Sequence, residues 1–379
     1  MRLVQIVGAR PQFIKLAPVS RALACHPEAA ELIVHTGQHY DPQLSQVFFD
    51  SLAIPPPAVN LEVGSGTHAQ QTAAMLERIE AYLLAERPDA VIVYGDTNST
   101  LAGALAAAKL HIPVAHVEAG LRSFNRRMPE ELNRVTTDHL ADLLLAPTDA
   151  AMQNLAAEGL AARAQQVGDV MYDALLSSIA VARDRSRVLE QLQLGARPFG
   201  LVTVHRADST TAAQLPAVLA VLERIAAAVV PLVFPVHPRT RAALRSCAPQ
   251  WRASQDLRLI EPLGPLDMLR LTEAAAVVIT DSGGLQKEAF MLGAPCVTLR
   301  AETEWTETLT AGANCVVGHE VSAALAAVQR ALAEAPPTRV ARARRAAALY
   351  GDGQAAERCA QQILALAARE RGAGGAAAP

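Results

Sequence analysis

The chain has 379 residues, 51% of them hydrophobic and 19% charged, and its 34 basic residues against 37 acidic ones leave a net charge of −3. At roughly 150 residues per domain this length predicts two domains, and the high aliphatic content excludes disorder over most of the chain. The lack of a basic excess argues against a protein that binds nucleic acid through bulk positive charge.

Short apolar runs alternate with longer helical patterns in the first half of the chain. Strands are expected at 3–7, 31–35, 90–94, 113–117 and 143–146. Helices are expected at 12–24 and 99–109. Near-continuous apolar strands separated by helices are typical of a parallel sheet that is covered on both faces.

The same alternation restarts after residues 165–175. A helix is expected at 173–194 and a turn at 195–198, followed by strands at 200–204, 232–236, 277–280 and 296–299. We therefore predict an α/β fold of two doubly wound Rossmann-like domains, 1–168 and 172–352. A last helix, 354–370, could pack on either domain, and the tail after residue 371 is expected to be disordered.

The N-terminal apolar run ends at a Gly and an Arg rather than at a cleavage site, so no signal peptide is expected. The longest apolar runs, such as 226–236, are too short to span a bilayer. The cysteines have no CxxC pair, which excludes a disulfide framework and a zinc site: Cys25, Cys247, Cys296, Cys315 and Cys359. We predict a cytoplasmic protein with no metal and no membrane partner.

Polar residues follow the predicted strands at the point where each strand ends. The segments are Gly8-Ala9-Arg10, Gly95-Asp96-Thr97, Glu118-Ala119-Gly120, His205-Arg206, His237-Pro238-Arg239 and Asp281-Ser282-Gly283-Gly284. Ligands of open α/β sheets bind beyond the carboxyl ends of the strands. We therefore expect one cleft, with the strand ends of both domains facing it.

Two segments have the composition of phosphate sites. GARPQFIK at 8–15 places a glycine at a helix start, where backbone N–H groups could approach an anion, and Arg10 and Lys15 would add cations. A tight turn with two solvated basic residues is the alternative. In DSGGLQKE at 281–288 the hydroxyl and amides of Ser282, Gly283 and Gly284 could hold a diphosphate, and Glu288 could accept from a ribose. The alternative there is an ordinary Asp or Ser N-cap.

Three carboxylates and two histidines are candidates for proton transfer and anion contact. Asp96, Glu118 and Glu130 lie in turns marked by Gly or Pro, with Asn133 and Arg134 close behind. Asp96 could instead cap the helix at 99–109, and Glu130 or Glu131 could merely complement a helix dipole. Both histidines are followed by arginines: His205 by Arg206, and His237 by Arg239 and Arg241. Gln38 and His39, which follow the strand at 31–35, are weaker candidates.

These segments together resemble the non-hydrolysing UDP-N-acetylglucosamine 2-epimerases. The resemblance runs from the N-terminus to GDGQA at 351–355, so it covers nearly the whole chain. It rests on GARPQFIK (8–15), YGDTNST (94–100), HVEAGLRSF (116–124), PEELNR (129–134), VGDVMYDAL (167–175), VTVHRAD (202–208), VHPRTR (236–241) and TDSGGLQKEAF (280–290).

The resemblance implies a fold like that of two-domain sugar-nucleotide glycosyltransferases (GT-B), with the last helix packing back on the N-terminal domain. It implies elimination of UDP from C1 and of the proton from C2, giving a glycal, followed by re-addition with the proton on the other face. No cofactor is needed, and family members are commonly homodimers. The family's catalytic residues match Asp96, Glu118, Glu130 and His205. Its substrate contacts match Arg10, Lys15, Ser282, Gly283, Gly284 and Glu288, to which we add Gln38, His39, Arg134, Arg206, His237, Arg239 and Arg300.

Departures from the commonest family pattern suggest a particular substrate. The chain has Ala9 and Gln12 where GTRPE is usual, and TEWTE at 303–307 where TERPE is usual. These features resemble a branch that epimerises UDP-2,3-diacetamido-2,3-dideoxy-glucuronate for surface-polysaccharide synthesis, although Asp208 and Ser209 depart from that branch's HRAEN. The substrate's C5 carboxylate would need a cation, for which Arg127, Arg239, Arg241 and Arg300 are candidates. Ala207 offers no charged contact to a UDP-N-acetylglucosamine activator.

Three other functions remain open from the sequence. The first is epimerisation of UDP-N-acetylglucosamine to UDP-N-acetylmannosamine. The second is a retaining UDP-sugar glycosyltransferase, against which the carboxylate set and the lack of an aromatic acceptor surface argue. The third is a non-enzymatic regulator that binds a sugar nucleotide, which would not need Asp96, Glu118, Glu130 and His205 together.

Overall fold

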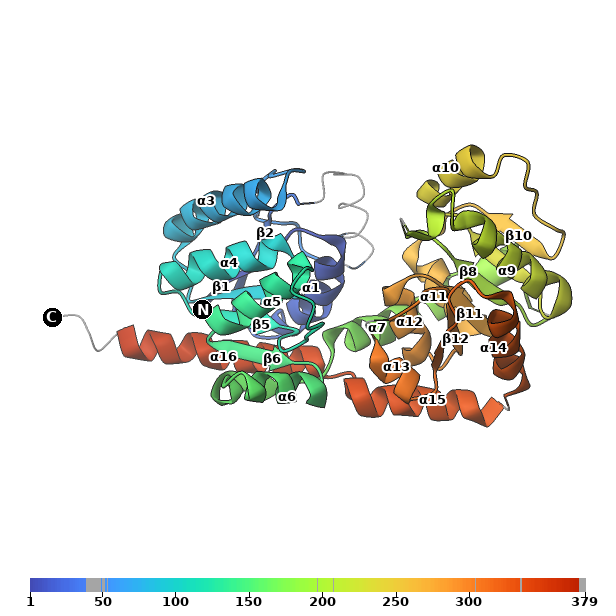
Figure 1. Cartoon of the computed structure of the whole chain (residues 1–379). Helices are drawn as coiled ribbons and strands as arrows, with labels where there is room; N and C mark the ends of the chain where they lie inside the picture. The colour runs from blue at the N-terminus through green and yellow to red at the C-terminus, as the bar shows by residue number, and fades with distance from the viewer. Residues whose placement is uncertain are drawn as a thin grey trace. The chain divides into compact units, whose positions relative to one another are not determined.

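The computed structural model describes residues 1–38, 49, 52, 54–195, 197–206, 208–303, 305–334 and 336–374, without the side chains of residues 10, 336, 337 and 370–374. His39 and Ala207 lie outside these residues, and so does the Arg10 side chain. The chain divides into two compact units, Met1–Leu176 with Leu349–Pro379, and Ser177–Ala348 (Figure 1). Helices α7 (Val170–Arg185) and α15 (Pro336–Tyr350) each run from one unit into the other.

The first unit is built on a seven-stranded parallel sheet of order β3-β2-β1-β4-β5-β6-β7. Its strands are β1 (Arg2–Val7), β2 (Ala30–His35), β3 (Val59–Asn60), β4 (Ala90–Tyr94), β5 (Val114–Val117), β6 (Leu143–Ala146) and β7 (Ala164–Gln166). The helices between them are α1 (Arg10–Leu23), α3 (His68–Glu86), α4 (Asn98–Lys109), α5 (Pro129–Leu140) and α6 (Asp149–Ala157). The strand order reverses between β1 and β4, so the ends of these two strands lie side by side at a switch point.

Alternate residues of β1 face two separate apolar layers. Leu3 and Val7 pack in the layer formed with α1, whereas Val4 and Ile6 pack in the layer formed with α3, α4 and α6. This alternation follows from the period of two of a β-strand. Since both faces are covered, the strand is apolar almost throughout, as the sequence pattern indicates.

The last helix, α16 (Ala355–Gly374), belongs to the first unit although it lies more than 200 residues downstream of β6 in the chain. It lies against α1 and buries Cys359, Ile363 and Ala367 in the first of the two layers. Asp173 of α7 accepts a hydrogen bond from the backbone N–H of Ala356, at 2.7 Å. In Figure 1 this helix, drawn in red, lies beside the strands and helices coloured blue to green.

The second unit is built on a six-stranded parallel sheet of order β10-β9-β8-β11-β12-β13. Its strands are β8 (Gly200–Thr203), β9 (Leu232–Pro235), β10 (Leu257–Ile260), β11 (Val277–Thr280), β12 (Cys296–Thr298) and β13 (Asn314–Val316). Its further helices are α8 (Val188–Gln191), α9 (Leu215–Ala228), α10 (Pro238–Cys247), α11 (Pro265–Ala274), α12 (Gly283–Met291), α13 (Thr306–Thr310) and α14 (Val321–Ala333). The switch point lies between β8 and β11, which lead into His205 and Asp281.

Two sequence expectations are wrong in detail. The helix expected at 173–194 is two helices, α7 and α8, because Ser186 leaves the helical path and its hydroxyl donates to Asp267 of α11 at 2.6 Å. The tail expected to be disordered after residue 371 is helical up to Gly374. The edge strands β3, β7, β10 and β13 are not among the predicted strands. β3, β7 and β13 have only two or three residues, and β10 is largely exposed, so none of them forms a long buried apolar run.

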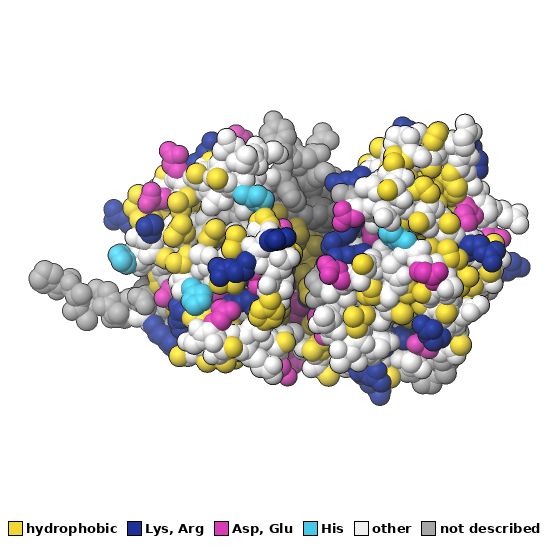
Figure 2. Space-filling model, in the orientation of Figure 1, with side chains coloured by type: hydrophobic (Ala, Val, Ile, Leu, Met, Phe, Trp, Pro, Cys, Tyr) yellow, Lys and Arg dark blue, Asp and Glu magenta, His cyan; other side chains and the backbone are white. Residues whose placement is uncertain are grey.

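The surface drawn in Figure 2 mixes charges of both signs with apolar side chains. Lys and Arg side chains on this face are interspersed with Asp and Glu rather than gathered into one basic patch. Among the described residues no helix is both long enough and apolar enough to cross a lipid bilayer.

Candidate functional site

The turns after β4 and β5 bring two of the predicted carboxylates together. The two strands are paired in parallel, with Tyr94 opposite Val117, so Asp96 and Glu118 follow at neighbouring strand ends. Gly95 (φ 64°), Glu118 (φ 69°) and Gly120 (φ 81°) all adopt the left-handed backbone region. For Glu118, a residue with a side chain, this conformation is strained, and such strain is concentrated at functional sites.

Glu118 forms an ion pair with Lys15 of α1, and both side chains are 8% exposed. A Cβ added at Gly95, which has a positive φ, would lie 2.9 Å from the Lys15 Nζ and 3.3 Å from the Glu118 Oε2, so a larger residue there would be strained and would displace this pair. Burial alone would lower the pKa of Lys15, but the attraction of Glu118 and Asp96 outweighs it and raises that pKa above its ordinary value. Lys15 is therefore a fixed cation at neutral pH.

Asp96 forms a second ion pair, with Arg134 of α5. The Arg134 Nη2 donates to Asp96 Oδ2 at 2.5 Å, and its Nη1 donates to Glu131 Oε2 at 2.7 Å. Burial alone would lower the pKa of Arg134, but Asp96 and Glu131 raise it. Asn133 donates to the backbone oxygen of Asp96 at 2.9 Å. The residues behind Glu130 in the sequence therefore hold the turn that carries Asp96.

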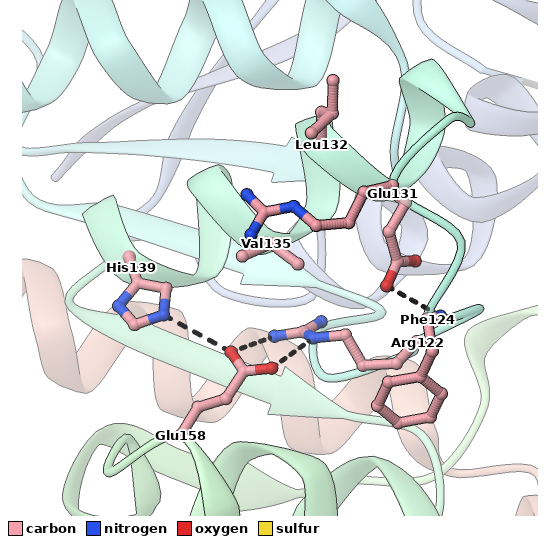
Figure 3. A pocket seen from close by; sticks show the side chains of 8 residues that line it. Arg122, Phe124, Glu131, Leu132, Val135, His139 and Glu158 are labelled. Carbon is pink, nitrogen blue, oxygen red and sulfur yellow. Dashed lines mark hydrogen bonds and ion pairs between the residues drawn. The ribbon is translucent and has the colours of Figure 1, made fainter.

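At the start of α5, Glu131 rather than Glu130 is the carboxylate whose hydrogen bonds hold the protein's own structure. Glu131 is 3% exposed and accepts hydrogen bonds from the backbone and hydroxyl of Ser123. It also accepts from the backbone N–H of Phe124, a bond drawn in Figure 3. Burial alone would raise the pKa of Glu131, but these bonds and the one from Arg134 lower it. Glu130 is exposed and has no hydrogen-bond partner among the residues with a described structure. Its predicted catalytic role remains a prediction.

The turn after β1 corrects one expectation from the sequence. The backbone N–H groups of Gly8 and Ala9 donate to the Gln12 side chain at 2.8 and 3.0 Å, so they are not free to hold an anion. The Gln12 amide in turn donates to the backbone oxygen of Tyr94 at 3.0 Å. Gly8 is required by packing, because an added Cβ would lie 1.9 Å from Thr36 Oγ1. Near this end of β1, the described group that could attract an anion is therefore the Lys15 ammonium rather than the backbone of the Gly8 turn.

Gln38 contacts Ser99, which lies at the start of α4 near this turn. The Ser99 hydroxyl lies 2.7 Å from the Gln38 Oε1 and 2.8 Å from the Thr36 hydroxyl. Thr97 is the N-cap of α4, accepting from the backbone of Thr100, so the alternative in which Asp96 caps this helix does not apply. The Asp96 carboxylate is thus left to Arg134.

In the second unit a buried aspartate orients the predicted histidine. Asp281 is fully buried and accepts from the backbone N–H groups of His205 (3.0 Å) and Arg206 (2.9 Å). The His205 Nδ1 lies 3.6 Å from the Asp281 Oδ1, and the His205 ring lies 5.5 Å from the His237 ring. His237 caps α10 by accepting from the backbone of Arg239. The sequence places Asp281 at a strand end but does not indicate that it holds His205.

The start of α12 keeps the features of an anion site. Ser282 is the N-cap, which agrees with the alternative derived from the sequence, but its bond from the backbone of Leu285 is long, at 3.5 Å. That bond uses a lone pair of the hydroxyl, so the hydroxyl proton stays available to a ligand. Gly283 and Gly284 form the first turn, where helix amides point outward. Glu288 lies one turn further along the same helix.

The candidate cations for a C5 carboxylate differ in their surroundings. The Arg241 guanidinium is paired with Glu261 at 2.6 Å. The Arg239 guanidinium donates to the backbone oxygen of His205 at 3.2 Å, which places it at the histidine cluster. Arg127 is exposed, in the segment between β5 and α5. Of these three arginines, as far as the structure describes them, Arg239 contacts a predicted catalytic residue, His205.

The chain matches one protein family over most of its length. A sequence model of the family described as UDP-N-acetylglucosamine 2-epimerase matches residues 21–364. A UDP-2,3-diacetamido-2,3-dideoxy-D-glucuronate 2-epimerase of Pseudomonas aeruginosa is 45% identical, over 97% of this chain and 100% of its own length. A UDP-N-acetylglucosamine 2-epimerase homolog of Methanococcus maripaludis is 50% identical, over 84% of this chain and 89% of its own length.

Solved structures agree with this assignment. The structure of the Methanocaldococcus jannaschii UDP-GlcNAc 2-epimerase in complex with UDP-GlcNAc and UDP has a TM-score of 0.82 and 40% identity, covering 96% of this chain and 100% of its own. The Neisseria meningitidis enzyme bound to UDP-GlcNAc has a TM-score of 0.82 and 27% identity over the same shares. The prediction of a GT-B-like α/β fold is thereby confirmed. The chain belongs to the UDP-N-acetylglucosamine 2-epimerase family and is an isomerase of UDP-sugars.

Proposed function

We propose that this protein inverts C2 of UDP-2,3-diacetamido-2,3-dideoxy-D-glucuronate. The observation that carries the substrate is the Pseudomonas aeruginosa relative of that name, which matches at 45% identity from end to end. The segments GARPQFIK and TEWTE, in which this chain departs from the commonest family pattern, support the same branch. Membership of the family also leads us to propose a cytoplasmic homodimer that serves surface-polysaccharide synthesis.

The chemistry we propose is elimination of UDP followed by re-addition. The C2 proton has no neighbouring carbonyl to acidify it, so cleavage of the C1–O bond must lead. Carboxylates stabilise the positive charge that develops at C1, and one of them removes the C2 proton. In the reverse step an acid group protonates C2 of the glycal on the opposite face, and the UDP oxygen forms the bond to C1 again. Two acid–base groups, one for each face, are therefore required.

The pairing of Asp96 and Glu118 with separate cations supports their assignment to these roles. Arg134 and Lys15 hold them at neighbouring strand ends, where carboxylates could stabilise a cation or accept a proton. Glu130 is exposed and is free to approach a substrate. His205 is 38% exposed and is oriented by Asp281, which suits a group that exchanges protons with a ligand.

We assign the UDP moiety mainly to residues of the second unit. The hydroxyl of Ser282 and the amides of Gly283 and Gly284 bind the diphosphate, to which Arg10, Lys15 and Arg206 add positive charge. Glu288 accepts from the ribose. Gln38, His39, His237, Arg239 and Arg300 complete the proposed substrate contacts, with Arg239 as our choice for the C5 carboxylate because of its contact with His205.

A direct comparison of two nucleotides tests the proposal. Purified protein is assayed in deuterated water, without an acceptor sugar, on the diacetamido-glucuronate nucleotide and on UDP-N-acetylglucosamine. We expect the higher kcat/KM for the former, without an activator, because only the diacetamido-glucuronate nucleotide offers Arg239 a carboxylate with which to pair. The product should carry deuterium at C2. Full retention of the original hydrogen contradicts the elimination scheme, whatever the substrate.

UDP-N-acetylglucosamine is the second candidate substrate. It is favoured by the 50% identical Methanococcus homolog and by the 42% identical Methanocaldococcus jannaschii relative, which is named for that activity. Equal or better use of this nucleotide would select it and would leave the proposed chemistry unchanged. A glycosyltransferase of similar fold, with a TM-score of 0.61, is only 15% identical, so it supports the fold alone.

A further inference from the structure

A fully buried histidine links the two turns that carry the candidate carboxylates. His116 is the third residue of β5, and both of its ring nitrogens are in hydrogen-bond contact. Its Nδ1 lies 2.6 Å from the Asp138 Oδ1, and its Nε2 lies 2.7 Å from the backbone oxygen of Gly95. Asp138 is also fully buried, on α5. Neither His116 nor Asp138 was among the site residues predicted from the sequence.

Both groups that face the His116 ring are hydrogen-bond acceptors. The Gly95 carbonyl oxygen can only accept. Asp138 is ionised, because its other oxygen accepts from the Gly120 backbone N–H at 3.0 Å and from the Arg122 guanidinium at 2.7 Å. Burial alone would raise the pKa of Asp138, but His116 and Arg122 lower it. A neutral imidazole has one N–H, so its second nitrogen would turn a lone pair toward an oxygen. The contacts are satisfied only when both nitrogens carry protons.

The charges around the ring also favour a cationic histidine. Arg122 contacts both Asp138 and Glu158, so one guanidinium faces two carboxylates. Figure 3 shows the outer end of this chain of contacts, where Glu158 lies between Arg122 and His139, beside a pocket of about 330 Å³. The nearby cations Lys15 and Arg134 are already committed to the carboxylates of the site. A positive charge on His116 would balance the second of the two carboxylates that Arg122 contacts.

We propose that His116 is a positioning residue that, as a buried imidazolium, ties the turn of Asp96 to the turn of Glu118. Its Nε2 holds the carbonyl of Gly95, which directly precedes Asp96. Through Asp138 it holds the N–H of Gly120, two residues after Glu118. The His116–Asp138 pair thereby maintains the left-handed backbone of both turns. It also sets the separation of the Asp96 and Glu118 carboxylates. The inference rests on the roles assigned to Asp96 and Glu118 under the proposed function.

The protonation state is tested without any substrate. Nitrogen NMR of the full chain, labelled at histidine, reports on both ring nitrogens, and the spectra of His116→Gln or Asp138→Asn assign them. We expect both His116 nitrogens to carry protons near pH 7, because each of them faces an oxygen acceptor. In Asp138→Asn we expect one of them to lose its proton. An unprotonated ring nitrogen in the unmodified protein near pH 7 overturns the proposal.

The positioning role is tested by kinetics with a matched control. In His116→Gln and in Asp138→Asn we expect kcat to fall on the order of 10²-fold with little change in KM, because small displacements of catalytic groups have effects of this size. Leu144→Ala is the control, since Leu144 pairs with His116 on the adjacent strand β6 and is fully buried but apolar. It should lower the melting temperature while kcat is retained.

Two kinetic outcomes contradict the positioning role. One is a kcat for Leu144→Ala that falls as far as that of His116→Gln at an equal loss of melting temperature, which reduces His116 to a structural part. The other is unchanged turnover in a folded His116→Gln variant. The assay uses whichever of the two UDP-sugars the unmodified protein converts faster, so a wrong substrate assignment does not affect it. If neither is converted, the proposed function fails while the NMR experiment still decides the state of His116.

Discussion

Adjacent glutamates at the start of α5 have different surroundings. Glu131 is buried and accepts from four donors, contributed by Ser123, Phe124 and Arg134, so it anchors the segment before the helix. Glu130 is exposed and has no such partner among the described side chains. At the scale of single residues this difference separates a structural carboxylate from one that can meet a substrate.

Substitution of each glutamate by glutamine should separate the two roles. Glu131→Gln should lower the melting temperature at neutral pH, whereas Glu130→Gln should lower turnover and leave the melting temperature unchanged. Because the pKa of Glu131 is lowered by folding, its contribution to stability is present above its unfolded pKa and is lost as the pH falls through the folded value. The difference in melting temperature between Glu131→Gln and the unmodified protein should therefore shrink on acidification. A stable, inactive Glu131→Gln would reverse the assignment.

The buried Lys15–Glu118 pair should be costly to break from one side. Lys15→Met leaves Glu118 buried and unpaired, so we expect the free energy of unfolding to fall by about 3–5 kcal/mol. Since folding raises the pKa of Lys15, its contribution is fully present below its unfolded pKa and is lost only in strongly alkaline solution. Denaturant unfolding at several pH values measures the effect.

The double variant Lys15→Met/Glu118→Gln provides the control for this prediction. It removes both charges, so it should recover part of the stability lost in Lys15→Met. Stability that falls by the sum of the two single effects would show that the two side chains are not coupled.

At the scale of elements, the last helix completes the core of the first unit. The side chain of Ile363 is fully buried against the layer formed by α1 and the sheet, whereas Gln361 on the same helix is exposed. The hydrophobic pattern of this segment predicts a helix, but it does not tell which sheet the helix covers. That depends on contacts with residues about 350 positions earlier in the chain.

Ile363→Ala should lower the free energy of unfolding by about 2–5 kcal/mol, through loss of apolar contact and formation of a cavity. Gln361→Ala, on the exposed face, should change it by less than about 0.5 kcal/mol. Chemical denaturation of both variants measures the difference. An equal effect of the two substitutions would mean that the buried face of α16 contributes little to stability.

At the scale of the whole molecule, each unit has its own sheet and its own apolar layers on both faces. Multidomain chains of this kind depart from two-state unfolding. We therefore expect two calorimetric transitions, of which Ile363→Ala lowers the one that belongs to the first unit.

UDP should raise the transition of the second unit, which contains Ser282, Gly283 and Gly284. Saturation at about a hundred times the dissociation constant stabilises the liganded unit by about 2.7 kcal/mol. Ser282→Ala should weaken UDP binding and reduce this shift without changing the transition in the absence of UDP. A UDP-induced shift confined to the first transition would contradict the assignment of the diphosphate site.

The alternation of apolar strands and helices determined the α/β class and placed the polar segments at strand ends, because the period of a strand and the continuous apolar character of a buried parallel strand are local properties of the sequence. The family segments likewise identified the UDP-sugar 2-epimerase class. Only the tertiary structure decided that Gln12 occupies the amides of the Gly8 turn, that Asp281 holds His205, and that His116 joins two turns through Asp138. Each of these contacts is a hydrogen bond whose geometry is set by the folded backbone, and those of His116 and His205 join residues that lie 21 to 76 positions apart. Sequence spacing predicts which residues share an edge of a sheet, but the directions of their donors and acceptors are set only when the sheet, turns and helices have packed.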